Sequence, residues 1–389
     1  MISSLRYFIL IALVALLTEN VMAQGTLSGA NTITTAVPFL AITPDSRAGG
    51  MGDAGVGTSA DVYSQHWNPA KYIFMESDMG VGLSYSPWLR NLVDDINLAY
   101  LSGYKKIDDV QAVSASLRYF ALGDIVFTSD LGEFMGQQNP NEFAIDLGYT
   151  RKLSDVFSGS VAVRYIRSDL TSGQMVGGVE THAGNSYAAD VAFYYYNEFR
   201  RSRKDNSFSA GINIQNIGSK ISYTEGEIKD FIPTTLKLGA AYTMEMDDYN
   251  SFSFSFEADK LLVPTPDTTR KVGEGEVWVG GIGSDIGVIE GIFKSLGDAP
   301  GGMKEEFQEI TWSLGVEYWY NKQFALRAGY FYEHANKGNR KFITAGAGLK
   351  MNVFSLDFAY LMPTQRNHPL ENTLRFSLSF DIDAFSNQR

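Results

Sequence analysis

The chain contains no cysteine, and no run of eighteen apolar residues follows its N-terminal segment. The first absence excludes disulfide bridges and thiol catalysis. The second excludes a bundle of membrane-spanning helices, each of which needs about twenty apolar residues. Basic residues are also in deficit, because 32 Lys and Arg face 44 Asp and Glu, for a formal net charge of −12. An acidic chain of this kind is a poor partner for nucleic acid.

What the chain does contain is a two-residue alternation of large apolar side chains with small or polar ones. It is clearest in S-F-S-F-S-F-E-A-D at 251–259, and it returns at 311–320 and 374–381. Successive side chains of a strand point to opposite faces, so each segment has one aromatic-rich face and one face of small residues and single charges. This pattern is typical of a transmembrane β-barrel, which faces lipid outside and is wet inside.

The N-terminus indicates an exported protein. Arg6 gives a positive start, 7–17 is an apolar core, and Val21-Met22-Ala23 supplies the small residues of a cleavage site. Such a segment is too short to span a bilayer, and it reads as a secretory signal cut after Ala23. We therefore predict a signal peptide at 1–23 and a cell-outer-membrane location.

Fourteen segments with this alternation can be marked between turn residues. Their connections are very short after even-numbered segments and mostly longer after odd ones, up to 49 residues at 261–309. Outer-membrane barrels have an even strand count, short periplasmic turns and long outer loops. The sequence thus predicts an all-β membrane protein, a fourteen-stranded antiparallel barrel at 79–383 with a tail at 384–389. The segments are 79–88, 96–105, 110–121, 142–152, 156–168, 186–199, 206–216, 234–244, 250–260, 310–320, 323–334, 340–351, 353–362 and 372–383.

The alternation also predicts which way side chains face. We expect these residues to face lipid: Phe252, Phe254, Phe256, Trp312, Leu314, Phe376 and Phe380. We expect these to face the lumen: Ser253, Ser255, Arg327 and Arg375. Lumen-facing charges of both signs are expected to pair with one another, and an ion path is the alternative.

Residues 24–78 precede the first strand and supply a hatch. A fourteen-stranded barrel is wider than one whose own side chains fill it, so something must close the lumen. Five glycines at 49–57 let the backbone approach a wall closely, and Asn68-Pro69 marks a turn. A phosphate-binding loop would need a preceding strand and a following helix with Lys-Ser or Lys-Thr, which are missing. We predict that residues near 31–75 fold within or against the periplasmic mouth.

Several stretches of the sequence carry a family resemblance. R-A-G-G-M-G-D-A-G-V-G at 47–57, followed by W-N-P-A at 67–70, resembles the hatch of FadL-like outer-membrane barrels, which also have fourteen strands. The stretches 35–52, 84–100 and 295–307 resemble the PorV (LptO) family of the type IX secretion system. The hatch motif in this chain consists of Gly49, Gly50, Met51, Gly52, Asn68, Pro69 and Ala70.

The resemblance implies a non-enzymatic carrier without metal or cofactor, embedded in outer-membrane lipid. Such a protein collects cargo at a large translocon of the SprA/Sov type by gripping the C-terminal signal domain of the cargo. It then delivers the cargo to a surface attachment complex with the PorU sortase, PorQ and PorZ.

Two other functions stay open. FadL-type transport of hydrophobic small molecules would use a pocket that Pro38–Ile42 could line, although the same residues could simply seal hatch to wall. The LptO name reflects proposed lipopolysaccharide deacylation, but neither G-x-S-x-G nor H-E-x-x-H occurs. The best pairs available are Ser186 with His182 and Thr364 with His368, which read more simply as polar loop residues. We expect no enzyme.

The outer loops carry the candidate partner-binding residues. In 261–309, Ser284 or Asp285 could cap a short helix with an apolar face that includes Ile286 and Ile292. Such a face could dock on the barrel rim or on a partner. The first outer loop brings Trp and Arg together, the residue types enriched at binding hot spots. The candidates are Trp88, Leu89, Arg90, Ile289, Phe293, Leu296, Asp298 and Pro300.

Overall fold

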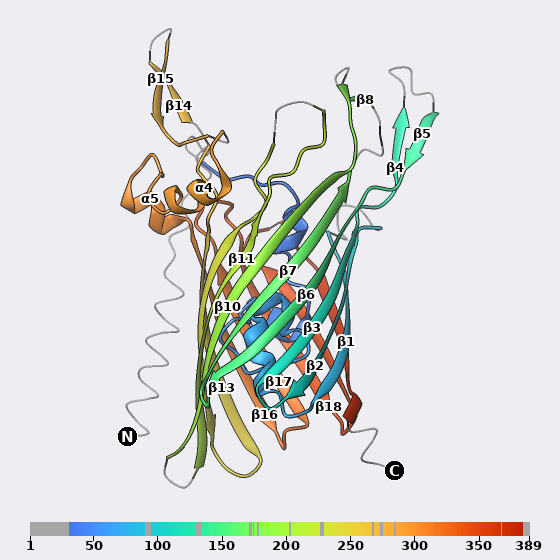
Figure 1. The fold of residues 1–389 in the computed structure, drawn as a ribbon, viewed down its shortest axis with the longest axis vertical. Coiled ribbons are helices and arrows are strands. Elements are labelled where there is room, and N and C mark those ends of the chain that lie inside the picture. Colours follow the sequence, from blue (N-terminus) through green and yellow to red (C-terminus); the bar gives the residue numbers. More distant parts are fainter. Residues whose placement is uncertain are drawn as a thin grey trace. The chain divides into compact units, whose positions relative to one another are not determined.

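The computed structural model describes residues 31–383, apart from 90–94, 129–133, 171–172, 174, 177–178, 202–203, 226–228, 267, 273–274, 284 and 367. The predicted signal peptide and C-terminal tail lie outside the described residues. Within this part, fourteen antiparallel strands close into one barrel, in which the last strand pairs with the first (Figure 1). The prediction of a fourteen-stranded antiparallel barrel is confirmed.

The barrel strands differ from the predicted segments by three residues or fewer at either end, the largest difference being at β2. They are β1 (Met79–Pro87), β2 (Asn97–Asp108), β3 (Gln111–Ala121), β6 (Asn141–Ser154), β7 (Phe157–Asp169), β10 (Gly184–Arg201), β11 (Lys204–Gly218), β12 (Thr235–Glu245), β13 (Asn250–Leu261), β16 (Ile310–Tyr320), β17 (Phe324–Tyr332), β18 (Lys341–Lys350), β19 (Phe354–Pro363) and β20 (Thr373–Asp381).

Side chains alternate between lipid and lumen along these strands. Phe254 and Leu314 expose 49% and 51% of their surface, whereas Arg327 and Arg375 expose 5% and 2%. Phe252 and Trp312 are half-buried on the same outer face as Phe254, because neighbouring rings pack against them, Tyr318 at 4.8 Å and Phe256 at 5.5 Å between centroids. The predicted facing is confirmed.

The end of the barrel that carries the long loops holds further elements, of which the sequence indicated only a short helix within 261–309 (Figure 1). Three loops contain small hairpins, and the longest loop also contains two helices. The hairpins are too short, and too poor in apolar alternation, to stand out as strands. They are β4 (Ile125–Thr128) with β5 (Phe134–Gln138), β8 (Met175–Val176) with β9 (Val179–Glu180), and β14 (Thr268–Val272) with β15 (Gly275–Gly280); the helices are α4 (Val288–Lys294) and α5 (Met303–Gln308). No helix among the described residues is long and apolar enough to cross a membrane.

The hatch, drawn in blue in Figure 1, lies inside the barrel wall. Its described residues, from 31 on, form short helices: η1 (Pro38–Ala41), α2 (Ser46–Gly49), α3 (Ser64–Trp67) and η2 (Pro69–Phe74). The Asp45 side chain caps α2 by accepting from the Ala48 amide at 2.9 Å, and Asn68 caps η2 in the same way.

The hatch runs through the lumen from one end to the other. At the outer end the Asn31 amide donates to the carbonyl of Asn336, between β17 and β18. At the periplasmic end the Ser158 hydroxyl donates to the carbonyl of Ala70 at 2.6 Å. The predicted placement at the periplasmic mouth was therefore too narrow, because residues 31–42 reach the outer mouth.

Candidate functional sites in the barrel mouth and on the outer loops

The hatch-motif glycines lie where backbone meets wall. Gly52 has a positive φ of 70°, and a Cβ there would lie 2.7 Å from the Tyr330 nitrogen. A Cβ on Gly57 would lie 2.4 Å from the Ala240 nitrogen. No side chain fits at either position, since such contacts are closer than van der Waals packing allows. Asn68 joins the same seal, because its amide donates to the Phe193 carbonyl at 2.9 Å.

Ion pairs also join the hatch to the wall. Arg47 of α2 donates to both oxygens of Glu317 on β16, at 3.0 Å and 2.8 Å. Glu317 also accepts from Arg327 at 2.7 Å, and Arg327 in turn contacts Asp357 at 2.6 Å. The expected pairing of lumen charges is confirmed here. The sequence did not reveal that the hatch supplies one of the partners.

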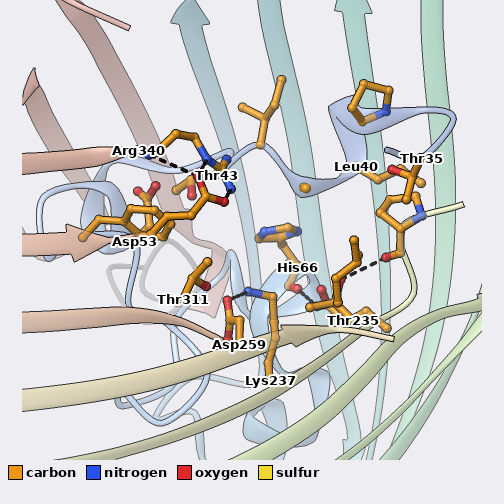
Figure 2. A pocket seen from close by; sticks show the side chains of 18 of the residues that line it. Thr35, Leu40, Thr43, Asp53, His66, Thr235, Lys237, Asp259, Thr311 and Arg340 are labelled. Atoms are coloured by element: carbon orange, nitrogen blue, oxygen red, sulfur yellow. Dashed lines mark hydrogen bonds and ion pairs between the residues drawn. The ribbon is translucent and has the colours of Figure 1, made fainter. Parts of the chain in front are cut away.

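A cavity of about 300 Å³ lies in the outer mouth, above the packed part of the hatch. Figure 2 shows His66 at its centre, with Lys237 and Asp259 of the wall below it and Leu40 of the hatch beside it. The lining combines apolar and charged side chains, and Arg340 lies over the ring of Phe331 at 5.4 Å. The lining includes Pro38, Leu40, Ile42, Trp88, Phe331, Phe342, Lys237, Asp259, Lys337, Arg340 and Arg375.

The tautomer of His66 follows from its partner. An Arg118 Nη2 lies 2.6 Å from His66 Nδ1, and a guanidinium can only donate, so Nδ1 accepts and the ring proton is on Nε2. Burial, together with the charge of Arg118, lowers the pKa of His66 well below its usual range. His66 is therefore a neutral donor at the cavity.

A second feature is an apolar surface on the longest outer loop, which we call the rim patch. Its five members are all large and exposed. They are Ile289, Phe293 and Leu296 on and just after α4, at 60%, 70% and 51% exposure, and Met303 and Phe307 on α5, at 66% and 64%. The last two were not among the predicted residues, although their i, i+4 spacing in M-K-E-E-F could have indicated them.

Two lysines hold α5 in place. Lys260 of β13 contacts Glu306 at 2.8 Å and Glu309 at 2.6 Å. Lys337 contacts Glu305 at 2.6 Å and Glu309 at 3.0 Å. The helix is thus tied to two different parts of the barrel rim, which fixes the two rim-patch residues that it carries, Met303 and Phe307.

Several predicted loop residues turn out to have structural roles. Trp88 and Leu89 are half-buried and pack on the cluster of Phe331, Phe342, Leu361 and Leu370, so they do not form an exposed docking loop. Asp298 is buried and accepts from the amide of Thr265 at 2.8 Å. Pro300 packs against Gly280. Arg90 lies outside the described residues.

The predicted helix cap is also wrong. Gly287 is the N-cap of α4 and no side chain bonds to the helix start, because the backbone at Gly287 is still extended. Asp285 and Ile286 therefore precede the helix, and Ser284 lies outside the described residues.

The two hydroxyl–histidine pairs do not form hydrogen bonds to each other. Ser186 donates to the Ser219 carbonyl at 2.6 Å, and Thr364 donates to the Lys341 carbonyl at 3.1 Å. His368 accepts from the Leu370 amide. No group of three His, Asp or Glu side chains in the described part of the chain is placed to hold a metal ion.

The closed fourteen-stranded barrel, lipid-facing outside and filled by an N-terminal hatch, defines a FadL-like outer-membrane protein. Two solved structures illustrate the likeness. The Pseudomonas putida toluene transporter TodX has a TM-score of 0.50 at 11% identity, over 86% of this chain and 96% of that one. A Pseudomonas aeruginosa FadL homologue has a TM-score of 0.44 at 12% identity, over 91% and 100%. At these identities the likeness concerns the fold alone.

Comparison with family models gives a more specific assignment than the fold does. The family model for "Type IX secretion system protein PorV" matches residues 26–268. The chain belongs to the PorV family of the type IX secretion system. No curated protein matches the sequence significantly.

Proposed function

We propose that this protein is a cargo carrier of the type IX secretion system. It binds the C-terminal signal domain of secreted proteins at a translocon of the SprA/Sov type. It then delivers them to the surface attachment complex that contains the PorU sortase, PorQ and PorZ. The observation that carries the proposal is the exposure of five large apolar side chains on and beside α4 and α5.

A helix on a protein surface normally packs its large apolar side chains inward. In α4 the fully buried positions are small: Gly291 lies against Phe231 and Pro264, and Ser295, just after the helix, exposes only 1% of its surface, while Val288 and Ile292 are half-buried. The large side chains of the rim patch lie on the other face. Burying one such side chain contributes about 1.5–3 kcal/mol, so the five together provide the apolar centre of a docking surface.

The support of the patch favours a binding role as well. Ordering a loop on binding costs free energy, and a loop already fixed by ion pairs avoids much of that cost. The lysine contacts of α5 provide such fixation for the part of the patch that α5 carries. The patch also lies at the end of the barrel with the long loops (Figure 1). In the proposed function, this is the end at which the carrier meets its partners.

Transport of small hydrophobic molecules is the second candidate, and the cavity in the outer mouth is what favours it. Below the cavity, however, Trp67, Lys71 and Tyr72 expose 2% of their surface or less. A solute could pass down the lumen only if the hatch moved. The carrier function needs no such movement.

The test is to replace Phe293 and Phe307 together by Ser and to measure surface display of a secreted reporter. Loss of two anchors of more than about 1 kcal/mol each should reduce display and co-purification of translocon or cargo at least tenfold. The matched control is Phe134→Ser, which removes a phenylalanine with 69% exposure from another outer loop. Heat-modifiable gel mobility verifies folding.

Normal display by the folded double variant would refute the rim patch as the docking surface. Equal loss in the Phe134 control would show that any outer-loop phenylalanine is needed, and the assignment to α4 and α5 would then fail.

A further inference from the structure

The described cations that line the cavity differ in how well they are paired. Lys237, Lys337 and Arg340 each make two contacts with carboxylate oxygens. Arg375 makes one, from Nη1 to Asp53 at 2.9 Å, and its Nε is buried without a partner. A guanidinium has five N–H donors, so Arg375 retains unused capacity to bind an anion.

The hatch motif leaves the space in which this guanidinium lies. A Cβ on Gly49 would lie 2.4 Å from Nη1 of Arg375 and 2.9 Å from its Cδ. Any larger residue at 49 would push the arginine side chain away. The glycine therefore positions Arg375, in addition to letting the hatch approach the wall.

A second donor and an acceptor line the same cavity. Arg118 binds Nδ1 of His66, and the Nε2–H on the other side of the ring has no hydrogen-bond partner among the described residues. Asp259 contacts Lys237 through Oδ2 at 2.5 Å, whereas its Oδ1 is buried without a partner. Each buried polar atom left unpaired is unfavourable, so a ligand with both acceptor and donor groups would be stabilised here.

The remaining wall suits apolar side chains. Leu40 of the hatch lines the cavity, together with Trp88, Phe331 and Phe342 of the barrel. A volume of about 300 Å³ is at the lower end of the range for small-ligand pockets, so the cavity holds a chain end and not a folded domain.

We propose that this cavity binds the free carboxyl end of a polypeptide, with Arg375 as the carboxylate anchor. The proposal rests on the carrier function and names the part of the cargo that enters the barrel. A peptide end has a carboxylate for Arg375 and His66, an N–H for Asp259, and side chains for the apolar wall. A fatty acid has the carboxylate and the apolar part but no N–H, so Asp259 favours the peptide.

The test measures binding to the purified barrel in detergent. The probe is a fluorescent pentapeptide of glycine, leucine and valine, blocked at its amino end, used as the free acid and as the carboxyl amide. We expect the acid to bind the parent protein at least tenfold more tightly than the amide. Arg375→Gln should bring the ratio of the two dissociation constants close to one, and Gly49→Ala should lower it as well because it displaces the arginine.

Arg340→Gln is the matched control, because Arg340 lines the same cavity but is already bound by Glu333 through two hydrogen bonds. It should keep the ratio of the parent. Equal binding of acid and amide by the parent would overturn the proposal, as would no binding of either at millimolar peptide. Dodecanoate is the competitor. If it displaces the peptide and has the lower dissociation constant, the cavity is a fatty-acid site and the proposal is overturned.

Display experiments separate this proposal from the carrier function. If Arg375→Gln leaves the acid-to-amide ratio unchanged while the double variant at Phe293 and Phe307 abolishes display, the cavity proposal alone fails. If that double variant displays cargo normally, the rim patch fails whatever the peptide measurements show.

Discussion

Replacing Arg47 by Met should loosen the hatch without unfolding the barrel. Arg47 makes two hydrogen bonds to Glu317, which exposes 2% of its side chain. Removing one partner of a buried ion pair costs about 3–5 kcal/mol. Glu317 keeps Arg327 at 2.7 Å in the variant, so we expect the lower value, about 3 kcal/mol. At about 1.4 kcal/mol per tenfold change, the open hatch becomes roughly a hundred times more populated.

The absence of cysteine makes this measurable. Ala54 lies in the hatch at 1% exposure, so Ala54→Cys supplies one small reporter that a maleimide reaches only when the hatch opens. The labelling rate should rise about a hundredfold in Arg47→Met, in line with the open population. Arg340→Met is the control, because Arg340 pairs with Glu333 of the wall and not with the hatch.

An unchanged labelling rate in Arg47→Met would refute the role of this ion pair as the fastening of the hatch. A similar rise in Arg340→Met would mean that either substitution loosens the whole barrel, and the reasoning from the Arg47 contacts would again fail.

Two further predictions concern the lipid face and pH. Phe254→Arg, on the lipid side near mid-strand, should lower the stability of the folded barrel by about 2–4 kcal/mol. Tyr320→Arg, at a strand end, should lower it by about 0–1 kcal/mol. Only the first variant should therefore lose heat-modifiable mobility. Equal tolerance would show that the register is wrong. Burial raises the pKa of Asp45 from 3.8 to about 6. The closed hatch therefore binds the proton more tightly than the open hatch does, and the closed state loses about 3 kcal/mol of stability as pH rises through that interval. Exchange of the Ala48 amide, corrected for its intrinsic rate, should therefore speed up with pH, and Asp45→Asn should remove this dependence.

The strands could be predicted because each one carries its own signal. In β13 the alternation of Phe and Ser determines both the existence of the strand and its register, since a slip by one residue would turn every phenylalanine into the lumen. The short turns add a second signal: Asn321 and Lys322 both have positive φ, as a tight turn between strands requires.

The hatch contacts could not be predicted, because their partners are far apart in sequence. Arg47 and Glu317 are 270 positions apart, and no pattern near either residue indicates the other. The same distance explains the error at Trp88, which packs on Phe331 and Phe342 from strands late in the chain. In α4 the spacing revealed an apolar face, but the direction of that face depends on Gly291 and its distant neighbours.

Because the hatch fills the lumen, an inward-facing position does not necessarily tolerate a larger side chain. Ser255 points inward, and a larger residue there would be expected to fit a wet interior. Yet a Cβ on neighbouring Gly315 would already lie 2.4 Å from the Ser255 hydroxyl and 2.7 Å from Met51 of the hatch. The interior at this level is packed like a protein core.

The path of the hatch restricts how the barrel can assemble. Asn31 is bound at the outer end, through Asn336 and Glu305, while Met79 opens β1 at the opposite end. The hatch segment is thus held at both ends of the barrel, unlike a plug that enters the lumen from one side. Either β1 and β20 pair around a hatch segment that is already in the lumen, or the hatch segment passes in extended form through the closed barrel.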